Sequence, residues 1–291
     1  MTNPTLICGA GMKLGKLKLH AAAVATFLLA AAPADSQPVP AAPTYADIAD
    51  LGLTAPVAAH VRVARAAALK PEASAGVRAG FARFLVEAQI VSLIRAPDGL
   101  ASRISYVVDL PRDAKGRPLK LKKGTEFLLL AAPVPGRPAE VRLVAPDAQI
   151  AYAPQRADTL RAILRESLAI NAPPRISGIG RAFHVPGAIR GESETQVFLL
   201  TADNRPVSLN VLRRPGETPR WSVALSEIVD DAAEPPARDT LLWYRLACTL
   251  PRALPRQGLA EADAAGAAAI QADYRLILER LGPCVRTRAR N

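Results

Sequence analysis

The sequence predicts an α+β fold made mainly of antiparallel strands, with a small N-terminal β-barrel or sandwich followed by a helix–β-meander–helix unit. Apolar residues alternate with polar ones over many short segments, which is typical of half-buried strands, and recur at three- and four-residue steps in three others, which is typical of helices. The 291 residues include 26 prolines, close to twice the usual share of about 5%. We therefore expect many short elements separated by turns.

A chain of this length fits one large domain or two modest ones. The patterns divide it into four parts: a signal peptide and N-terminal region (1–36), an N-terminal β domain (44–153), a C-terminal α+β domain (156–285) and a basic tail (286–291).

The N-terminal β domain has five segments with the alternation of strands, each bounded by turn residues. They are 57–65, 83–95, 102–110, 125–131 and 140–144. Proline and glycine punctuate them, as turns require. Five strands of this spacing suit a barrel like those that bind oligonucleotides or oligosaccharides, although the number of strands does not fix the topology.

The C-terminal domain begins with a predicted helix over 158–170, for which Asp158 is a candidate cap. A three-stranded meander follows, and the glycine-rich segment before it is expected to be a bend. Two helices are predicted at the end of the domain, 239–250 with Asp239 as cap and 259–281 ending at Gly282 and Pro283.

The first residues have the pattern of a targeting signal. Lys13, Lys16 and Lys18 precede an apolar stretch at 21–32, and small residues then offer cleavage after Ala34 or Ser36. The alternative is a membrane anchor, but this stretch is shorter than the roughly 20 residues that span a bilayer. We expect an exported protein, periplasmic or secreted, with no transmembrane span after cleavage; translation could start at Met1 or Met12.

Two cysteines, Cys248 and Cys284, remain after the predicted cleavage. An even number in an oxidising compartment predicts one disulfide, here between the last turn of one helix and the end of the next. A free reactive pair is the alternative, but the Cys-x-x-Cys spacing of such pairs is missing.

The segment from 177 to 195 collects glycines, a histidine and polar side chains. A triad of His184, Ser193 and Asp203 can be written down for it, but triads are recognised by geometry. The Gly-x-Ser-x-Gly pattern of a nucleophile elbow is broken at Thr195.

His60 is expected to be an ordinary half-exposed strand histidine. The spacing of histidines and cysteines predicts neither a metal site nor a cofactor.

The formal charge is +11, and the densest basic run, 115–123, contains Lys120, Lys122 and Lys123. This run could meet an anionic surface or be a solvated hairpin. Nucleic acid is not an expected partner, because no aromatic residue in the run could stack on bases. The arginines of the tail could extend an anionic-surface site or be mobile.

From the 45–50 region to about residue 254, the chain resembles an uncharacterised family of exported bacterial proteins, and its recognisable stretches are 183–187, 191–196 and 239–248. The resemblance implies export and a single architecture, and it transfers no activity and no site residues.

These observations favour a non-catalytic binding or adaptor module of the cell envelope, which binds an envelope protein or a ligand between its two β units. The alternative is a periplasmic hydrolase that uses the His184–Ser193 segment.

Overall fold

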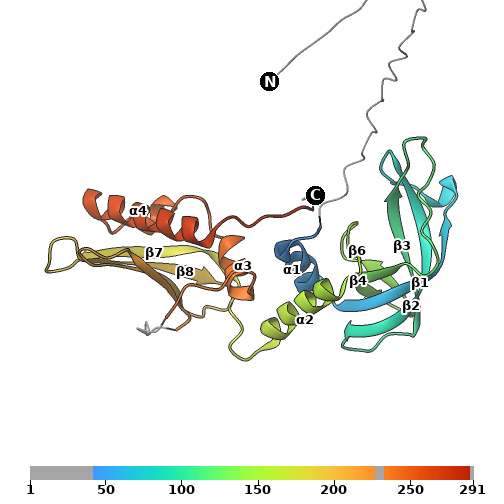
Figure 1. Cartoon of the computed structure of the whole chain (residues 1–291), viewed down its shortest axis with the longest axis horizontal. Coiled ribbons are helices and arrows are strands. Elements are labelled where there is room, and N and C mark those ends of the chain that lie inside the picture. Colours follow the sequence, from blue (N-terminus) through green and yellow to red (C-terminus); the bar gives the residue numbers. More distant parts are fainter. Residues whose placement is uncertain (1–41, 227–232, 289–291) are drawn as a thin grey trace, which may run out of the picture. The chain divides into compact units, whose positions relative to one another are not determined.

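The computed structural model describes residues 42–226 and 233–288 (Figure 1). The predicted signal segment and both candidate cleavage sites lie outside the described residues. None of the helices in the described ranges is long and apolar enough to cross a membrane.

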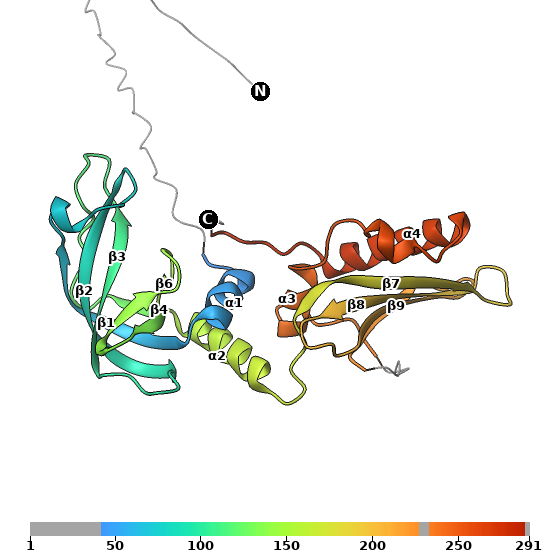
Figure 2. The same ribbon diagram turned by 180° about the vertical axis from the view of Figure 1, so that it is seen from behind.

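Five strands close into the predicted N-terminal barrel (Figures 1 and 2). They are β1 (Val57–Ala68), β2 (Phe81–Arg95), β3 (Arg103–Pro111), β4 (Glu126–Val134) and β5 (Arg137–Leu143). β1 pairs with both β2 and β4, and these pairings are antiparallel, as are β2–β3 and β4–β5. A parallel pairing of β3 with β5 completes the circle. This connectivity is that of the oligonucleotide/oligosaccharide-binding type of barrel.

Alternation along the strands separates the barrel's interior from its surface. On β2, Phe84, Val86 and Ala88 are buried as predicted, while Leu85 between them is exposed. β3 continues the pattern, with Tyr106 and Val108 inside and Val107 outside. The barrel therefore has an apolar interior and also carries apolar side chains on the outer face of β2 and β3.

Helix α1 (Tyr45–Thr54), which the sequence patterns did not predict, begins with a capping box. Thr44 Oγ1 accepts a hydrogen bond from the amide of Asp47 at 3.2 Å, and the Asp47 carboxylate accepts one from the amide of Thr44 at 2.9 Å. Both bonds satisfy amides that a helix start leaves free. The buried face of α1 packs with α2 (Pro154–Leu168) against the outer surface of β1 and β4.

The predicted start of α2 was four residues late and its predicted end two residues late. Pro154 occupies the first turn, where its missing N–H costs nothing, and Ala153 is the cap, so the expectation that Asp158 caps the helix is wrong. Leu160, Ile163 and Leu164 form the buried stripe as predicted.

The predicted meander is a four-stranded antiparallel sheet. Its order is β10 (Arg220–Ala224), β9 (Val207–Arg213), β8 (Ser193–Thr201) and β7 (Ile176–Pro186). The glycine-rich segment is not a bend but the edge strand β7, which pairs with β8. A Cβ at Gly180 would approach the carbonyl oxygen of Phe198 to 3.3 Å, so glycine here allows a close approach between strands.

One face of the sheet packs on α3 (Leu241–Ala247) and α4 (Ala264–Leu281), which follow it in sequence (Figure 1). Thr240 caps α3, whereas Asp239, the predicted cap, has a left-handed backbone with φ of 58°. Asp263 caps α4, so the helix begins later than predicted, after a short 3₁₀ turn at Arg256–Leu259. The predicted stripe of Ile270, Tyr274, Ile277 and Leu281 is buried.

The disulfide between Cys248 and Cys284 is present, with Cα atoms 5.1 Å apart. It joins the end of α3 to the residue that begins the C-terminal segment, three positions after the last residue of α4.

Candidate functional sites

An apolar groove of about 520 Å³ runs along the outer face of the barrel where β3 approaches β5. Leu85 and Val107 are partners across β2 and β3 and are 38% and 43% exposed. They form one wall of the groove, and the hairpin between β4 and β5, with Pro133 and Pro135, forms the other. Exposed apolar neighbours in a concave site are typical of a binding surface.

The groove follows the weakest seam of the barrel. A single residue pair, Ser105 with Glu140, joins β3 to β5, whereas β3 is paired with β2 along its whole length. The phenol of buried Tyr106 donates to Oε1 of Gln149 at 2.6 Å and ties β3 to the segment that follows β5. Burial raises the pKa of Tyr106, so this hydroxyl remains a donor. Beyond the pair of Ser105 with Glu140, the side of β3 that faces β5 has no ladder partner among the described residues.

Basic side chains border the groove. Arg137 forms an ion pair with Glu140 at 2.8 Å. Arg142 also lines the groove, is exposed, and has no ion pair or side-chain hydrogen bond among the residues that the structure describes. The rim can therefore pair with a carboxylate from a ligand.

A second site surrounds His184 on the sheet. Nδ1 of His184 lies 2.9 Å from Oγ1 of Thr195, its partner across β7 and β8. Thr195 is buried, and its hydroxyl donates to Oδ2 of Asp273 on α4 at 2.5 Å. The other carboxylate oxygen of Asp273 accepts a hydrogen bond from Nε of Arg213 at 2.8 Å. Strands β7, β8 and β9 and helix α4 thus meet in one polar chain, whose central members Thr195 and Asp273 are buried.

A pocket of about 460 Å³ opens next to this chain, between the edge strand β7 and the first turn of α4. His184 lines it together with Phe183, Glu261 and Asp263. The arrangement presents a histidine and two carboxylates, but among the described residues no group of three or more His, Cys, Asp or Glu side chains is placed to hold a metal ion.

The structure does not assemble the predicted triad. Ser193 lies opposite Pro186, and Thr195 is the residue that contacts His184. Asp203 lies beyond the other end of β8 and pairs with Arg205 at 2.8 Å. Thr195 cannot take the place of the serine as nucleophile, because it is buried and its proton is committed to Asp273.

His60 is not the half-exposed strand residue that was predicted. It is only 6% exposed, it contacts Oε2 of Glu126 at 3.0 Å through Nε2, and it stacks on Tyr152 with ring centroids 3.6 Å apart. These contacts hold β1 to β4 and to the start of α2, a structural role.

Lys120, Lys122 and Lys123 are exposed on the connection between β3 and β4. None of their ammonium groups forms an ion pair within the described ranges, 42–226 and 233–288. The three charges are therefore free to meet an anionic surface.

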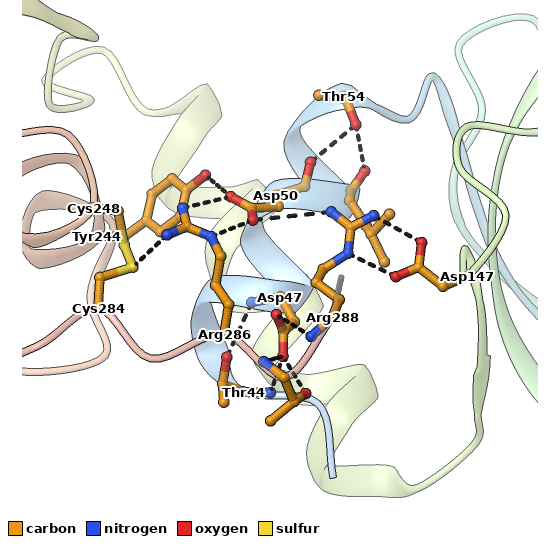
Figure 3. A network of polar contacts seen from close by, with 12 residues as sticks. Thr44, Asp47, Asp50, Thr54, Asp147, Tyr244, Cys248, Cys284, Arg286 and Arg288 are labelled. Atoms are coloured by element: carbon orange, nitrogen blue, oxygen red, sulfur yellow. Dashed lines mark hydrogen bonds and ion pairs between the residues drawn. A yellow bond between two sulfur atoms is a disulfide. The ribbon is translucent and has the colours of Figure 1, made fainter. Parts of the chain in front are cut away.

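The start of the basic tail is tied to the chain by a polar network (Figure 3). Arg286 makes two hydrogen bonds to the Asp50 carboxylate, and Arg288 pairs with Asp147 through both Nε and a terminal nitrogen. Thr287 donates to Asp47, which also belongs to the capping box of α1. The described part of the tail is thus engaged in intramolecular pairs. It is neither a mobile segment nor a set of free arginines that could meet an anionic surface.

Burial and hydrogen bonding set the pKa values in this network. Burial works to raise the pKa of Asp50, but the hydrogen bonds from Arg286 and Tyr244 bring it below its ordinary value. Burial, followed by the hydrogen bond to Asp50, raises the pKa of Tyr244 to about 12. The network therefore consists of a carboxylate that remains ionised and a phenol that remains protonated at neutral pH.

The sequence analysis did not predict three members of the site around His184, namely Thr195, Arg213 and Asp273. Asp273 did leave a signal, because it falls within the apolar stripe of its helix, between Ile270 and Ile277. A carboxylate on a buried helix face requires a partner.

Comparison with models of known protein families matches none of them, and comparison with curated proteins gives no match. The functional argument therefore depends on the sites themselves.

Proposed function

We propose that the protein is an exported, non-catalytic binding module, and that its barrel captures an extended polypeptide segment of an envelope partner in the groove beside β3. The observation that carries the proposal is the groove itself, with an apolar wall of exposed Leu85 and Val107 along a strand that is joined to β5 by one residue pair. Export is supported by the predicted signal segment and by the disulfide, since structural disulfides persist in oxidising compartments.

The chemistry of the groove favours polypeptide over other extended ligands. Sites for single-stranded nucleic acid use exposed aromatic rings for stacking, but the single aromatic residue among those lining this groove, Tyr106, is buried. Apolar walls suit alternate side chains of an extended peptide, and a strand with an open side can pair with its backbone.

The charge of the rim selects among peptides. Arg142 lacks an acidic partner in the described chain, and Arg137 is exposed beside it on β5. An acidic side chain on the ligand would complete a charge-assisted hydrogen bond there. We expect the segment that binds to alternate apolar and acidic residues.

The hydrolase alternative receives no support from the geometry of its segment, because Ser193 and His184 are not paired and Thr195 is buried.

Selection from a random peptide display library on the mature protein tests the proposal. We expect enriched peptides that alternate apolar and acidic residues and that bind Val107→Glu about tenfold or more weakly, because this change puts a carboxylate on the apolar wall. Leu200→Glu is the matched control, since Leu200 is 51% exposed on the sheet and outside the groove. Failure to enrich such peptides, or equal affinity for Val107→Glu, would overturn the proposal.

A further inference from the structure

The polar chain behind His184 determines which nitrogen of its ring carries a proton. The Asp273 carboxylate, paired with the Arg213 guanidinium, can only accept hydrogen bonds. Thr195 has one hydroxyl proton and uses it toward Asp273, so its oxygen is left as an acceptor for the contact at 2.9 Å with His184 Nδ1. Nδ1 must therefore donate.

A neutral histidine with its proton on Nδ1 has its lone pair on Nε2. This second nitrogen has no hydrogen-bond partner among the described residues, and the ring that carries it lines the pocket between β7 and α4. Such anchoring of one ring nitrogen is the usual way in which a protein fixes the role of the other. His184 is thus held as a hydrogen-bond acceptor toward the pocket.

The two acidic side chains that line the pocket are acceptors as well. Glu261 has only a loose ion pair, 3.8 Å from Arg181, and both side chains are more than half exposed. Asp263 uses one oxygen to cap α4, accepting the amide of Gly266 at 2.7 Å, and its other oxygen has no partner within the described residues. A ligand that complements these side chains brings an N–H donor for Nε2 and a positive charge.

We propose that this pocket is a second ligand site, separate from the barrel groove, and that it takes a compound with a primary ammonium group. The ammonium donates to Nε2 of His184, and the carboxylates of Glu261 and Asp263 add negative charge to the pocket, while Ala182 and Pro186 offer apolar surface to the attached carbon chain. The volume of about 460 Å³ falls within the range of small-molecule sites.

The tautomer and the binding can be measured in one NMR experiment on the mature protein at about pH 8, where an ordinary histidine is neutral. Long-range ¹H–¹⁵N correlation should show His184 protonated at Nδ1 and not at Nε2. Titration with n-butylammonium should shift the Nε2 resonance, whereas n-butyltrimethylammonium, which has the charge but no N–H donor, should not shift it.

Variants then separate the site from general charge effects. His184→Ala should weaken n-butylammonium binding about tenfold or more, and Glu261→Gln about fivefold. Glu279→Gln, on the exposed side of the same helix, should leave binding unchanged. Nα-acetyl-lysine methylamide serves as a second probe. Tighter binding of n-butylammonium would identify a free amine as the natural ligand, and tighter binding of the blocked lysine would identify a lysine side chain. A proton on Nε2, an equal response to the trimethyl compound, or unchanged binding by His184→Ala would overturn the proposal.

Discussion

Nε of Arg286 donates to Oδ2 of Asp50 at 2.6 Å, across 236 residues of sequence. Both side chains are at least 80% buried, with side-chain exposures of 15% and 20%. The pair fastens the C-terminal segment to α1 immediately after the disulfide, and one terminal nitrogen of Arg286 also contacts Sγ of Cys284 at 2.9 Å. The chain's last described residues are therefore part of the structure that holds α1.

Replacement of Arg286 tests the energetic weight of this pair. We expect Arg286→Met to lower the free energy of unfolding by about 2 kcal/mol at pH 7, the scale of hydrogen bonds to a charged group. Because the folded-state pKa of Asp50 is lowered, the contribution is present above the unfolded pKa of about 3.9 and disappears as the pH falls through the folded pKa.

The measurement is urea unfolding of both proteins between neutral pH and pH 3. The gap between them should shrink below about pH 4. Arg161→Met, which removes an exposed pair with Asp158, should cost less than about 1 kcal/mol. A gap that is missing at pH 7, or that widens in acid, would contradict this view of the pair.

The disulfide should contribute more than the pair of Arg286 with Asp50. It closes a sequence separation of 36 residues, so replacing both cysteines by serine is expected to cost about 3–4 kcal/mol on the chain-entropy model. Unfolding with and without reductant measures this cost. Mass spectrometry after alkylation of the unreduced protein should find Cys248 and Cys284 unmodified, and modification of either would show that the bridge does not form.

The pair of Arg213 with Asp273 is a stability element independent of any ligand. Asp273 is 1% exposed, and Arg213→Met would leave a buried carboxylate without its counter-ion, at a cost of about 3 kcal/mol or more. We expect Arg213→Met/Asp273→Leu to recover a large part of the loss, because no buried charge remains. A double-mutant cycle of unfolding free energies checks this, and a double variant as unstable as the single one would argue against it.

The basic run should determine any affinity for anionic membranes. Lys120, Lys122 and Lys123 are exposed and carry charges that no described residue neutralises. Replacing all three by glutamine should abolish salt-sensitive retention on anionic vesicles. Lys70, Arg220 and Arg280 are exposed elsewhere, and their replacement by glutamine is the charge-matched control. Equal retention of the two triple variants would remove the run as a membrane contact.

Local patterns in the sequence were sufficient to predict most strands of the barrel. The segment 83–95 places Phe84, Val86, Ala88 and Ile90 on one face, and β2 spans Phe81–Arg95. The parallel pairing of β3 with β5 could not be predicted, because it depends on contacts between segments that no turn connects. β7 was not predicted, because its glycines are typical of a bend. The close approach of the Phe198 carbonyl oxygen to Gly180 explains why glycine occupies a strand there.

Neither candidate site could be predicted from local patterns, because each joins residues that are far apart in the sequence. The groove joins side chains of β2, β3, β4 and β5, and the chain behind His184 joins residues as far apart as Thr195 and Asp273, 78 positions along the sequence. The sequence analysis could identify His184 as a candidate, because its segment collects glycines and polar side chains. Its partner could not be identified, since Ser193 and Thr195 are equally plausible until the strand register places Thr195 opposite it.

The most direct test of the binding proposal is amide NMR of the ¹⁵N-labelled mature protein titrated with a blocked peptide of alternating valine and glutamate. We expect the largest shifts at Ser105, Val107 and Arg142, with slower hydrogen exchange along β3 as its open side gains a backbone partner. Shifts that centre on the sheet and α4, or a barrel that does not respond to the peptide, would contradict the claim that the groove beside β3 binds polypeptide.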